Sequence, residues 1–421
     1  MKKTVYGIIK KSEPLRKLAR ALYFGLKRIL YLINTAFVKT QPKTVFFCSF
    51  NGKAFSDSPK QLYLDMLASP DFSDYEFIWG FEQPDKHTLP AESKNTVIVR
   101  THSAAYEKAL KKSGVWITNF RIGDYFIPSK KQRYIQCWHG TPLKKLGYDI
   151  DRGNNALNSV SEIKGKYLED AKKFTHIISP SPFTTQKLIS AFNLKALGKE
   201  DSVIEEGYPR NDFLYRYTPG DVSQIKREVG VPEDKRVILY APTWRDNQHI
   251  SGVGYSYKTE IDFDRLRSSL PDNYVLLFRA HYFVANSFDF ERYKGFVYNV
   301  SDYDDIARLY VISDMLITDY SSVFFDYANL SRPIIFYMYD LEQYRGQIRD
   351  FYFPPEELPG EIVTTQEQLT RAVIEYDKGF TPDLRYTEFK KRFNPLDDGN
   401  ASHRTLARIF YNRDRSSGNG E

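Results

Sequence analysis

The sequence predicts an α/β protein of two Rossmann-like domains that face each other across a cleft. Two observations carry this prediction. Short apolar runs alternate with amphipathic segments from residue 44 onward, and one turn-rich stretch divides those runs into two groups. A chain of 421 residues with 30 Phe, 31 Tyr and 4 Trp can build two separate cores, which excludes a disordered or low-complexity class.

Ten of the apolar runs are predicted as strands. Most gaps between them fit a helix and two short loops, as parallel βαβ units require. The runs are almost continuously apolar, as in a sheet that helices cover on both faces. The expected strands are 45–50, 77–79, 97–100, 115–118, 134–138 and 176–179, followed by 237–240, 275–279, 315–318 and 334–337.

The boundary between the domains is expected in the turn-rich stretch 207–221. Ligands of open α/β sheets bind beyond the carboxyl ends of the strands, so the cleft between the domains is the expected site. The predicted segments are an arm at 1–43, a first domain at 44–215, a second domain at 216–412 and a disordered polar tail at 413–421.

The N-terminal arm holds the excess positive charge of the chain. Of 60 basic and 53 acidic residues, 11 basic residues and one acidic residue lie in 1–43, so the rest of the chain is slightly acidic. This distribution argues against a nucleic-acid-binding body. Apolar residues recur in the arm at the spacing of one helix face, namely Leu15, Leu18, Leu22, Leu26, Ile29, Ile33 and Phe37.

The arm and the cysteines together predict a peripheral protein on a membrane surface that faces a reducing compartment. The basic amphipathic helix lacks an apolar stretch long enough to span a bilayer or to form a signal peptide. We expect it to lie on an anionic membrane surface, which attracts each nearby basic residue by about 1 kcal/mol. The alternative is a helix packed on the body with its basic face in solvent. Cys48 and Cys137 lie in apolar runs, which excludes a disulfide scaffold or zinc ribbon and favours a reducing compartment.

The first candidate site follows the predicted strand 134–138. His139 stands at the tip of that strand, where an imidazole can accept a proton near neutral pH. Gly140 and Thr141 allow a ligand to approach the backbone closely, and Lys144 can offset phosphate charge. The alternative is a histidine that only hydrogen-bonds a carbonyl at a turn. The Gly-Thr-Pro sequence after it favours the functional interpretation.

A second candidate site follows the predicted strand 275–279. Alternation along the strand directs Arg279 and His281 to one side. A cation beside an imidazole suits a phosphate that develops charge during transfer. The alternative is a surface arginine beside a histidine with a purely structural hydrogen bond. Because a histidine follows a strand here as it does at 134–138, the functional interpretation is favoured.

A third candidate site follows the predicted strand 315–318. Ser321 and Ser322 open a predicted helix, whose first N–H groups and serine hydroxyls form an anion site. The alternative, that Ser321 caps the helix, is compatible with that role. Asp319 is a candidate to orient His281 or a hydroxyl, and Asp326 is a candidate ribose contact.

Two arginines complete the candidate set. Arg245 follows the predicted strand 237–240 and is a candidate phosphate or base contact. Arg210 lies in the interdomain turn, where a hinge role is favoured and a phosphate or acceptor contact is the other interpretation. No convincing carboxylate cage for a metal is present, so no cofactor is expected to be required, although Mg²⁺ can accompany a phosphate-containing ligand.

These motifs resemble those of the CDP-glycerol glycerophosphotransferases, the teichoic acid primases and polymerases of bacterial envelopes. They occur in family order from about residue 134 to 404. The motifs are WHGTPLK at 138–144, GYPRND at 207–212, YAPTWR at 240–245, RAH at 279–281 and TDYSS at 318–322, then FYF at 351–353, LPG at 358–360, FNP at 393–395 and DDGNAS at 397–402.

The resemblance implies a glycosyltransferase-B fold with an acceptor-side first domain and a second domain that binds a CDP donor. The implied reaction transfers glycerol phosphate or ribitol phosphate from CDP-glycerol or CDP-ribitol to an undecaprenyl-linked or other lipid-linked acceptor and releases CMP. His139 aligns with the base that activates the acceptor and His281 with the second essential histidine. Ser321 and Ser322 align with contacts to the donor phosphates.

Several alternatives stay open at this point. Family polymerases often carry a long N-terminal region where this chain has a short arm, so a primase or short-chain role is expected alongside polymerisation. The donor polyol and the product (wall teichoic acid, lipoteichoic acid or capsule) are not specified by the sequence. Two other classes are a nucleotide-sugar glycosyltransferase of the same fold and a non-catalytic membrane-associated binding protein.

Overall fold

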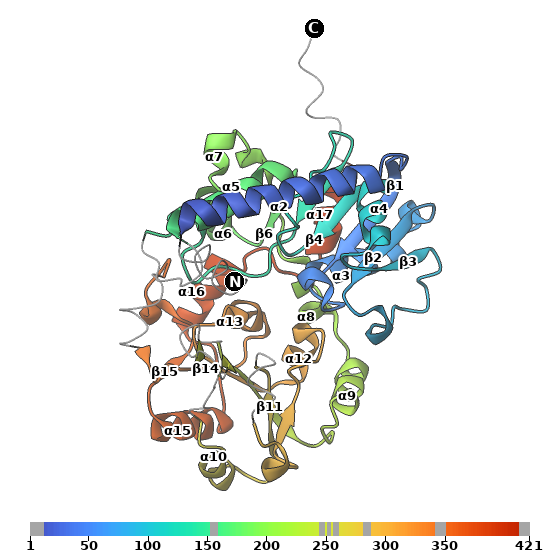
Figure 1. Ribbon diagram of the computed structural model, residues 1–421. Coiled ribbons are helices and arrows are strands. Elements are labelled where there is room, and N and C mark those ends of the chain that lie inside the picture. Colours follow the sequence, from blue (N-terminus) through green and yellow to red (C-terminus); the bar gives the residue numbers. More distant parts are fainter. Residues whose placement is uncertain are drawn as a thin grey trace.

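The computed structural model describes residues 12–151, 159–243, 249–250, 254–255, 261–280, 288–341 and 351–411. Its strands form two larger parallel sheets and a small hairpin, and the two sheets occupy the upper and lower halves of Figure 1. The division between the sheets falls between β7 (Val203–Glu205) and β8 (Arg236–Ala241). The predicted α/β class with two parallel sheets is therefore confirmed, whereas the domain boundaries stay a prediction.

The first sheet has the strand order β3-β2-β1-β4-β5-β6-β7. The order reverses between β1 and β4, and the loops after these two strands diverge there and leave room for a ligand. Alternate residues of β1 enter different apolar clusters on the two faces of the sheet, Val45 and Phe47 on one and Phe46 and Cys48 on the other. Its strands are β1 (Gln41–Cys48), β2 (Glu76–Phe81), β3 (Thr96–Arg100), β4 (Ser113–Thr118), β5 (Arg133–Gln136), β6 (His176–Ser179) and β7.

The second sheet has the strand order β12-β11-β8-β13-β14-β15, which reverses between β8 and β13. Its strands are also buried on both faces, as their nearly continuous apolar sequences require. They are β8, β11 (Tyr274–Phe278), β12 (Val297–Asn299), β13 (Met315–Thr318), β14 (Ile334–Tyr337) and β15 (Glu361–Val363).

All ten predicted strands are confirmed, with ends that shift by a few residues. The sequence did not predict β7, β12 and β15, which have three residues each and lie at sheet edges. Such strands are too short to show a run of apolar residues. The hairpin of β9 (His249–Ile250) and β10 (Gly254–Tyr255) was also not predicted.

Helices cover both faces of each sheet and supply the crossovers between parallel strands. In the first half of the chain they are α3 (Asp57–Ala68), α4 (Ala104–Lys112), α5 (Val160–Lys173), α6 (Pro182–Ala191), α7 (Leu194–Leu197), α8 (Phe213–Arg216) and α9 (Pro219–Glu228). Later in the chain they are α10 (Phe263–Ser269), α12 (Ile306–Ile312), α13 (Val323–Tyr327), α15 (Gln366–Asp377), α16 (Leu384–Phe393) and α17 (Ala401–Phe410).

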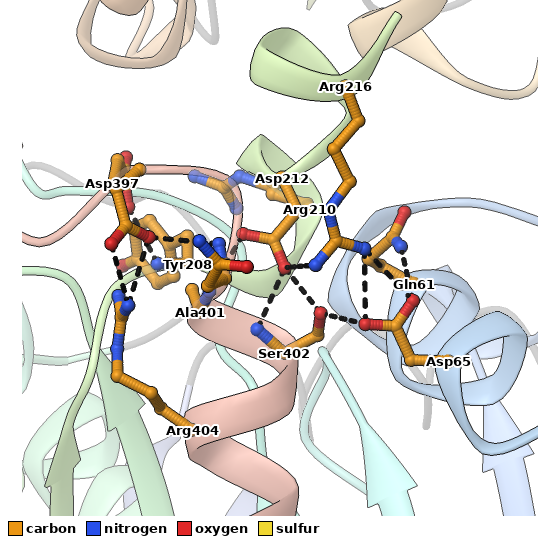
Figure 2. A network of polar contacts seen from close by, with 12 residues as sticks. Gln61, Asp65, Tyr208, Arg210, Asp212, Arg216, Asp397, Ala401, Ser402 and Arg404 are labelled. Carbon is orange, nitrogen blue, oxygen red and sulfur yellow. Dashed lines mark hydrogen bonds and ion pairs between the residues drawn. The ribbon is translucent and has the colours of Figure 1, made fainter. Parts of the chain in front are cut away.

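The chain passes from one half to the other twice, and hydrogen bonds connect the two passages. The first passage contains the 3₁₀ turn η6 (Pro209–Asn211), and the second precedes α17, which packs on the first sheet. Figure 2 shows Asp212 at the junction, where its carboxylate accepts hydrogen bonds from the backbone N–H groups of Ala401 and Ser402 at 2.9 and 2.8 Å. Because α17 packs on the first sheet, both connecting segments lie next to the first domain.

The helix α2 (Glu13–Asn34) lies across the outside of the first domain (Figure 1). Its contacts with the body are polar and aromatic. Arg16 and Arg20 pair with Glu162, and Tyr31 is buried beside Phe126. Within the described ranges, no helix combines the length and apolar character needed to cross a bilayer.

Candidate active site

A cavity of about 480 Å³ opens between the two halves, where the carboxyl ends of strands from both sheets meet. The first-domain wall is the segment after β5. The second-domain wall is formed beyond the ends of β8, β11 and β13, at the point where the second sheet reverses its order. The lining residues are 138–144 and Leu146 on one side, and 241–243, Arg279, Ala280, Ser301, Ile306 and 320–323 on the other.

The cavity brings together seven of the twelve candidate site residues. They are His139, Gly140, Thr141, Lys144, Arg279, Ser321 and Ser322. Three further candidates, Asp319, Asp326 and Arg210, lie outside the cavity lining. Arg245 and His281 lie outside the described residues.

His139 is oriented as a base. Its Nδ1 lies 3.0 Å from the backbone carbonyl oxygen of Asn119, which can only accept, so Nδ1 carries the proton and donates it. The basic atom is then Nε2, to which the described residues supply no hydrogen bond. Although His139 is exposed at the cavity, nearby protein atoms lower its pKa by desolvation, against the opposing effect of the Asn119 hydrogen bond. A lowered pKa keeps the ring neutral at pH 7, as proton abstraction requires.

The backbone around His139 explains how it reaches the second domain. Trp138 adopts a left-handed φ of +52°, which turns the chain sharply after β5, and its indole stacks on the imidazole with centroids 4.3 Å apart. Gly140 has a φ of +155°, and a Cβ at this position would lie 2.9 Å from Ser322 Oγ. Because a larger residue would push the two walls apart, glycine allows the loop to touch the serine of the opposite domain.

The two serines stand where α13 begins. Ser322 occupies the N-cap position, so the interpretation of Ser321 as the capping residue is wrong, and the Ser322 side chain makes no capping hydrogen bond. With only five residues, α13 contributes little dipole, so the hydroxyls are the main anion-binding groups on this wall. Both hydroxyls line the cavity opposite His139.

Arg279 supplies a cation in a fixed orientation. Its Nη1 donates hydrogen bonds to the carbonyl oxygens of Val300 at 3.0 Å and Tyr303 at 2.6 Å. Burial lowers its pKa, and the charges of Asp305 and Asp304 oppose that shift. A guanidinium stays charged at neutral pH, so this wall can stabilise a phosphate.

Thr141 is another candidate donor for a ligand. It is 1% exposed, and its Oγ1 has no hydrogen-bond partner in the described part of the chain. A buried hydroxyl without a partner costs free energy unless a ligand or water satisfies it. Lys144 lies further along the same wall, where its backbone pairs with Phe351 in an isolated bridge.

Asp319, Asp326 and Arg210 make contacts that the sequence did not predict. Asp319 Oδ1 accepts the backbone N–H of Thr243 at 2.8 Å and so fixes the chain after β8. Asp326 accepts from Arg210 Nη2 at 2.9 Å and from Asn211 Nδ2 at 3.1 Å. The carboxylate of Asp326 is therefore directed at the interdomain turn instead of a ribose in the cavity.

Sequence reasoning missed Asn119. This residue directly follows β4, and β4 lies beside β5 in the sheet. Its backbone carbonyl orients His139, and its Oδ1 accepts the N–H of Phe50 at 2.8 Å in the loop after β1. Its position at the carboxyl end of a predicted strand was the available signal.

Comparisons with known proteins agree on one family. The family described as CDP-Glycerol:Poly(glycerophosphate) glycerophosphotransferase matches residues 29–411. A teichoic acid poly(glycerol phosphate) polymerase of Bacillus spizizenii is 35% identical over 402 residues, which cover 95% of this chain and 100% of that protein. A teichoic acid glycerol-phosphate transferase of Staphylococcus aureus is 38% identical over 370 residues, which cover 87% of this chain and 92% of that protein.

A solved structure supports the same relationship. The wall teichoic acid polymerase TagF, in a variant soaked with CDPG, aligns with a TM-score of 0.83 at 34% identity, over 94% of this chain and 97% of that chain. Some relatives are much longer than this chain. The chain spans 52% of the length of a poly(glycerol phosphate) polymerase of Staphylococcus epidermidis, to which it is 37% identical.

Proposed function

Because the chain belongs to the CDP-glycerol:poly(glycerophosphate) glycerophosphotransferase family of transferases, we propose that it transfers a polyol phosphate from a CDP-activated donor to a teichoic acid acceptor and releases CMP. One observation carries the proposal: a neutral, oriented base, His139, stands across a single cavity from Arg279 and two serine hydroxyls. All three relatives described above are named for glycerol phosphate, so CDP-glycerol is the expected donor and CDP-ribitol the second candidate.

In the proposed reaction, the acceptor hydroxyl lies beside His139, and Nε2 takes its proton. The hydroxyl oxygen bonds to the phosphorus that carries the polyol, while the bond from that phosphorus to the bridging oxygen breaks and CMP leaves. Arg279 and the hydroxyls of Ser321 and Ser322 stabilise charge on the phosphoryl oxygens. Positioning and charge stabilisation of this kind supply most of the catalysis in phosphoryl transfer.

The orientation of α2 supports the proposal that the protein binds an anionic membrane at its cytoplasmic face. Its polar residues face the body, where Arg16 and Arg20 pair with Glu162. Most of its apolar residues face outward, with Leu22 67% and Ile33 65% exposed. An apolar helix face with basic neighbours suits the membrane interface, where a lipid-linked acceptor would present its growing end. A helix docked through its apolar face, the alternative considered from the sequence, would show the opposite exposure.

Any Mg²⁺ is proposed to arrive with the donor. The described lining of the cavity contains no carboxylate, and the described residues contain no group of three or more His, Cys, Asp or Glu side chains placed to hold a metal. The diphosphate oxygens of the donor would then supply the ligands. Loss of CMP release in EDTA and its recovery with Mg²⁺ would establish the dependence.

The decisive experiment combines purified full-length protein, a lipid-linked acceptor and each CDP-polyol separately. We expect CMP release with CDP-glycerol, and product mass shows whether one unit or a ladder of units is added. Release of a nucleoside diphosphate from a nucleotide sugar instead would identify a glycosyltransferase. If folded protein released CMP from neither donor, the proposal would be wrong.

The His139→Ala variant tests the base. General base catalysis contributes about 10²- to 10⁴-fold, so turnover should fall by that factor while donor affinity changes only a few-fold. His403→Ala, at an exposed histidine on α17, is the matched control and should keep full activity. A loss of donor affinity as large as the loss of turnover would refute the role of His139 as a base.

A further inference from the structure

Arg210 lies behind the cavity and contacts both domains. It is 8% exposed, and it belongs to η6, the turn between the domains. Its Nη2 donates to Asp326 Oδ1 at 2.9 Å, and its Nη1 lies 3.5 Å from Asp57 Oδ2. Asp57 begins α3 in the first domain, and Asp326 lies on α13 in the second. One guanidinium therefore joins the first domain, the interdomain turn and the second domain.

The same guanidinium stands next to the point where the two cavity walls touch. A Cβ built on Gly140 would lie 3.9 Å from Arg210 Nη2 and 2.9 Å from Ser322 Oγ. The helix that carries Asp326 starts immediately after Ser322. An ion pair that holds α13 from behind therefore also fixes where Ser322 meets the loop of His139.

The backbone of Asp57 has a strained conformation at the point where its carboxylate faces Arg210. Asp57 adopts a left-handed φ of +64°, a region that residues other than glycine enter infrequently. Its Oδ1 accepts the N–H of Ser58 at 2.5 Å, and Oδ2 faces Arg210. Strained residues persist where the surrounding structure fixes them, and they concentrate at functional sites.

The charges of Asp57 and Arg210 affect the pKa of His139. Asp57 raises the pKa of His139, and Arg210 lowers it. The charged side chains in the described lining of the cavity are Lys144 on the same loop as His139 and Arg279 on the opposite wall. Asp57 and Arg210 thus act on the proposed base with opposite signs.

We propose that Arg210 is a positioning residue of the active site, which aligns the base on the first domain with the phosphate-binding serines on the second by holding Asp57 and Asp326 together. This inference rests on the proposed function. It predicts that loss of the guanidinium slows turnover by about 10²-fold, the effect of a misplacement of about 1 Å, while the KM for the donor changes only a few-fold.

The first test uses two variants that each remove one charge, Asp57→Asn and Arg210→Gln, and follows the titration of His139 by NMR in the full-length protein. Asp57→Asn removes an anion and should move the midpoint to lower pH. Arg210→Gln removes a cation and should move it to higher pH. Shifts of opposite sign support the proposal. Shifts of the same sign, or none, overturn it, because Asp57 and Arg210 would then not act on the base that they are proposed to position.

The second test uses chemical rescue of Arg210→Ala. Arg210 lines a second cavity of about 570 Å³ on its other side, so guanidinium ions can enter the space left by the side chain. Millimolar guanidinium should restore CMP release at least tenfold, whereas sodium chloride at the same ionic strength should not. Folded Arg210→Ala with turnover within threefold of wild type, or with no recovery in guanidinium, would overturn the proposal.

These readouts separate this inference from the proposed function. The NMR titration reports the effect of Arg210 on His139 whether or not CMP is released. Wild-type protein that releases no CMP would refute the proposed function and leave that effect measurable. If Arg210→Ala does not fold because two buried carboxylates lose their partner, the Asp57→Asn and Arg210→Gln variants carry the test.

Discussion

The helices α2 and α17 stand at opposite ends of the described chain and resemble each other in sequence pattern. Both are amphipathic, and each makes several hydrogen bonds to a carboxylate of the body. They differ in the direction of their apolar faces. In α17, Leu406 and Ile409 are buried in the same cluster as Trp79, whereas α2 exposes most of its apolar residues to solvent.

The two carboxylates that anchor these helices, Glu162 and Asp212, also differ. Glu162 binds side chains of α2, accepting from Arg16 at 2.8 Å and from Arg20 at 2.8 Å. Asp212 binds the backbone at the start of α17, through the N–H groups of Ala401 and Ser402 (Figure 2). A helix held by its backbone start is part of the fold. A helix held by long basic side chains lies on the fold and keeps its apolar face available.

The largest expected difference is in stability. Leu406→Ala removes a side chain that is 5% exposed and should lower the free energy of unfolding by about 2–5 kcal/mol. Leu26→Ala on α2, where the side chain is 59% exposed, should change it by less than about 0.5 kcal/mol. Urea denaturation measures both. Equal losses would mean that α2 is part of the core in solution.

The second expected difference is in membrane binding. Burial of a leucine side chain contributes about 1.5–3 kcal/mol, so Leu22→Ser with Leu26→Ser should weaken partition to anionic vesicles at least tenfold. Unfolding in urea should not change. Leu384→Ser, at a leucine that is 76% exposed on the second domain, is the control and should bind as wild type does. Equal binding by all three proteins would remove α2 from the proposed membrane contact.

Sequence periodicity predicted the apolar face of α2 but not what lies against it. The face is a local property of residues three and four apart. The partner depends on Glu162, which lies about 140 residues later and gave no local signal. The same limit explains the strands, because the central ones are long apolar runs and the three-residue edge strands are defined by their neighbours in the sheet.

The cavity shows where sequence reasoning about the site succeeded and where it did not. His139, Arg279 and Ser322 each lie at or just after the carboxyl end of a predicted strand. Parallel strands bring these ends together, so their meeting was predictable. Arg210 and Asp326 are partners across 116 residues. Considered alone, Asp326 was assigned to a ribose, and Arg210 was assigned to a hinge with a phosphate or acceptor contact as the alternative. Pairing between distant buried charges is decided by packing of the two domains, which the local sequence does not encode.

The third expected difference is in the effect of removing the charge of each anchoring carboxylate. Asp212→Asn replaces one of the acceptor oxygens that hold α17 with a donor, and should lower the free energy of unfolding by about 1–3 kcal/mol. Glu162→Gln should raise the hydrogen-exchange rate of α2 amides without lowering the stability of the body, because only side-chain contacts are lost. A global loss of stability in Glu162→Gln would contradict the distinction between the two anchors.

The smallest expected difference is in the response to acid. Arg16 lowers the pKa of Glu162 from 4.5 to about 2, so this anchor contributes stability above pH 4.5 and loses it as the pH falls toward 2. Burial raises the pKa of Asp212, against the hydrogen bonds from Ser402, so protonation of that anchor favours the folded state. Between pH 6 and pH 3, hydrogen exchange corrected for its intrinsic pH dependence should therefore show α2 opening before α17. If α17 opened first, or both opened together, the two carboxylates would not hold their helices in the different ways described above.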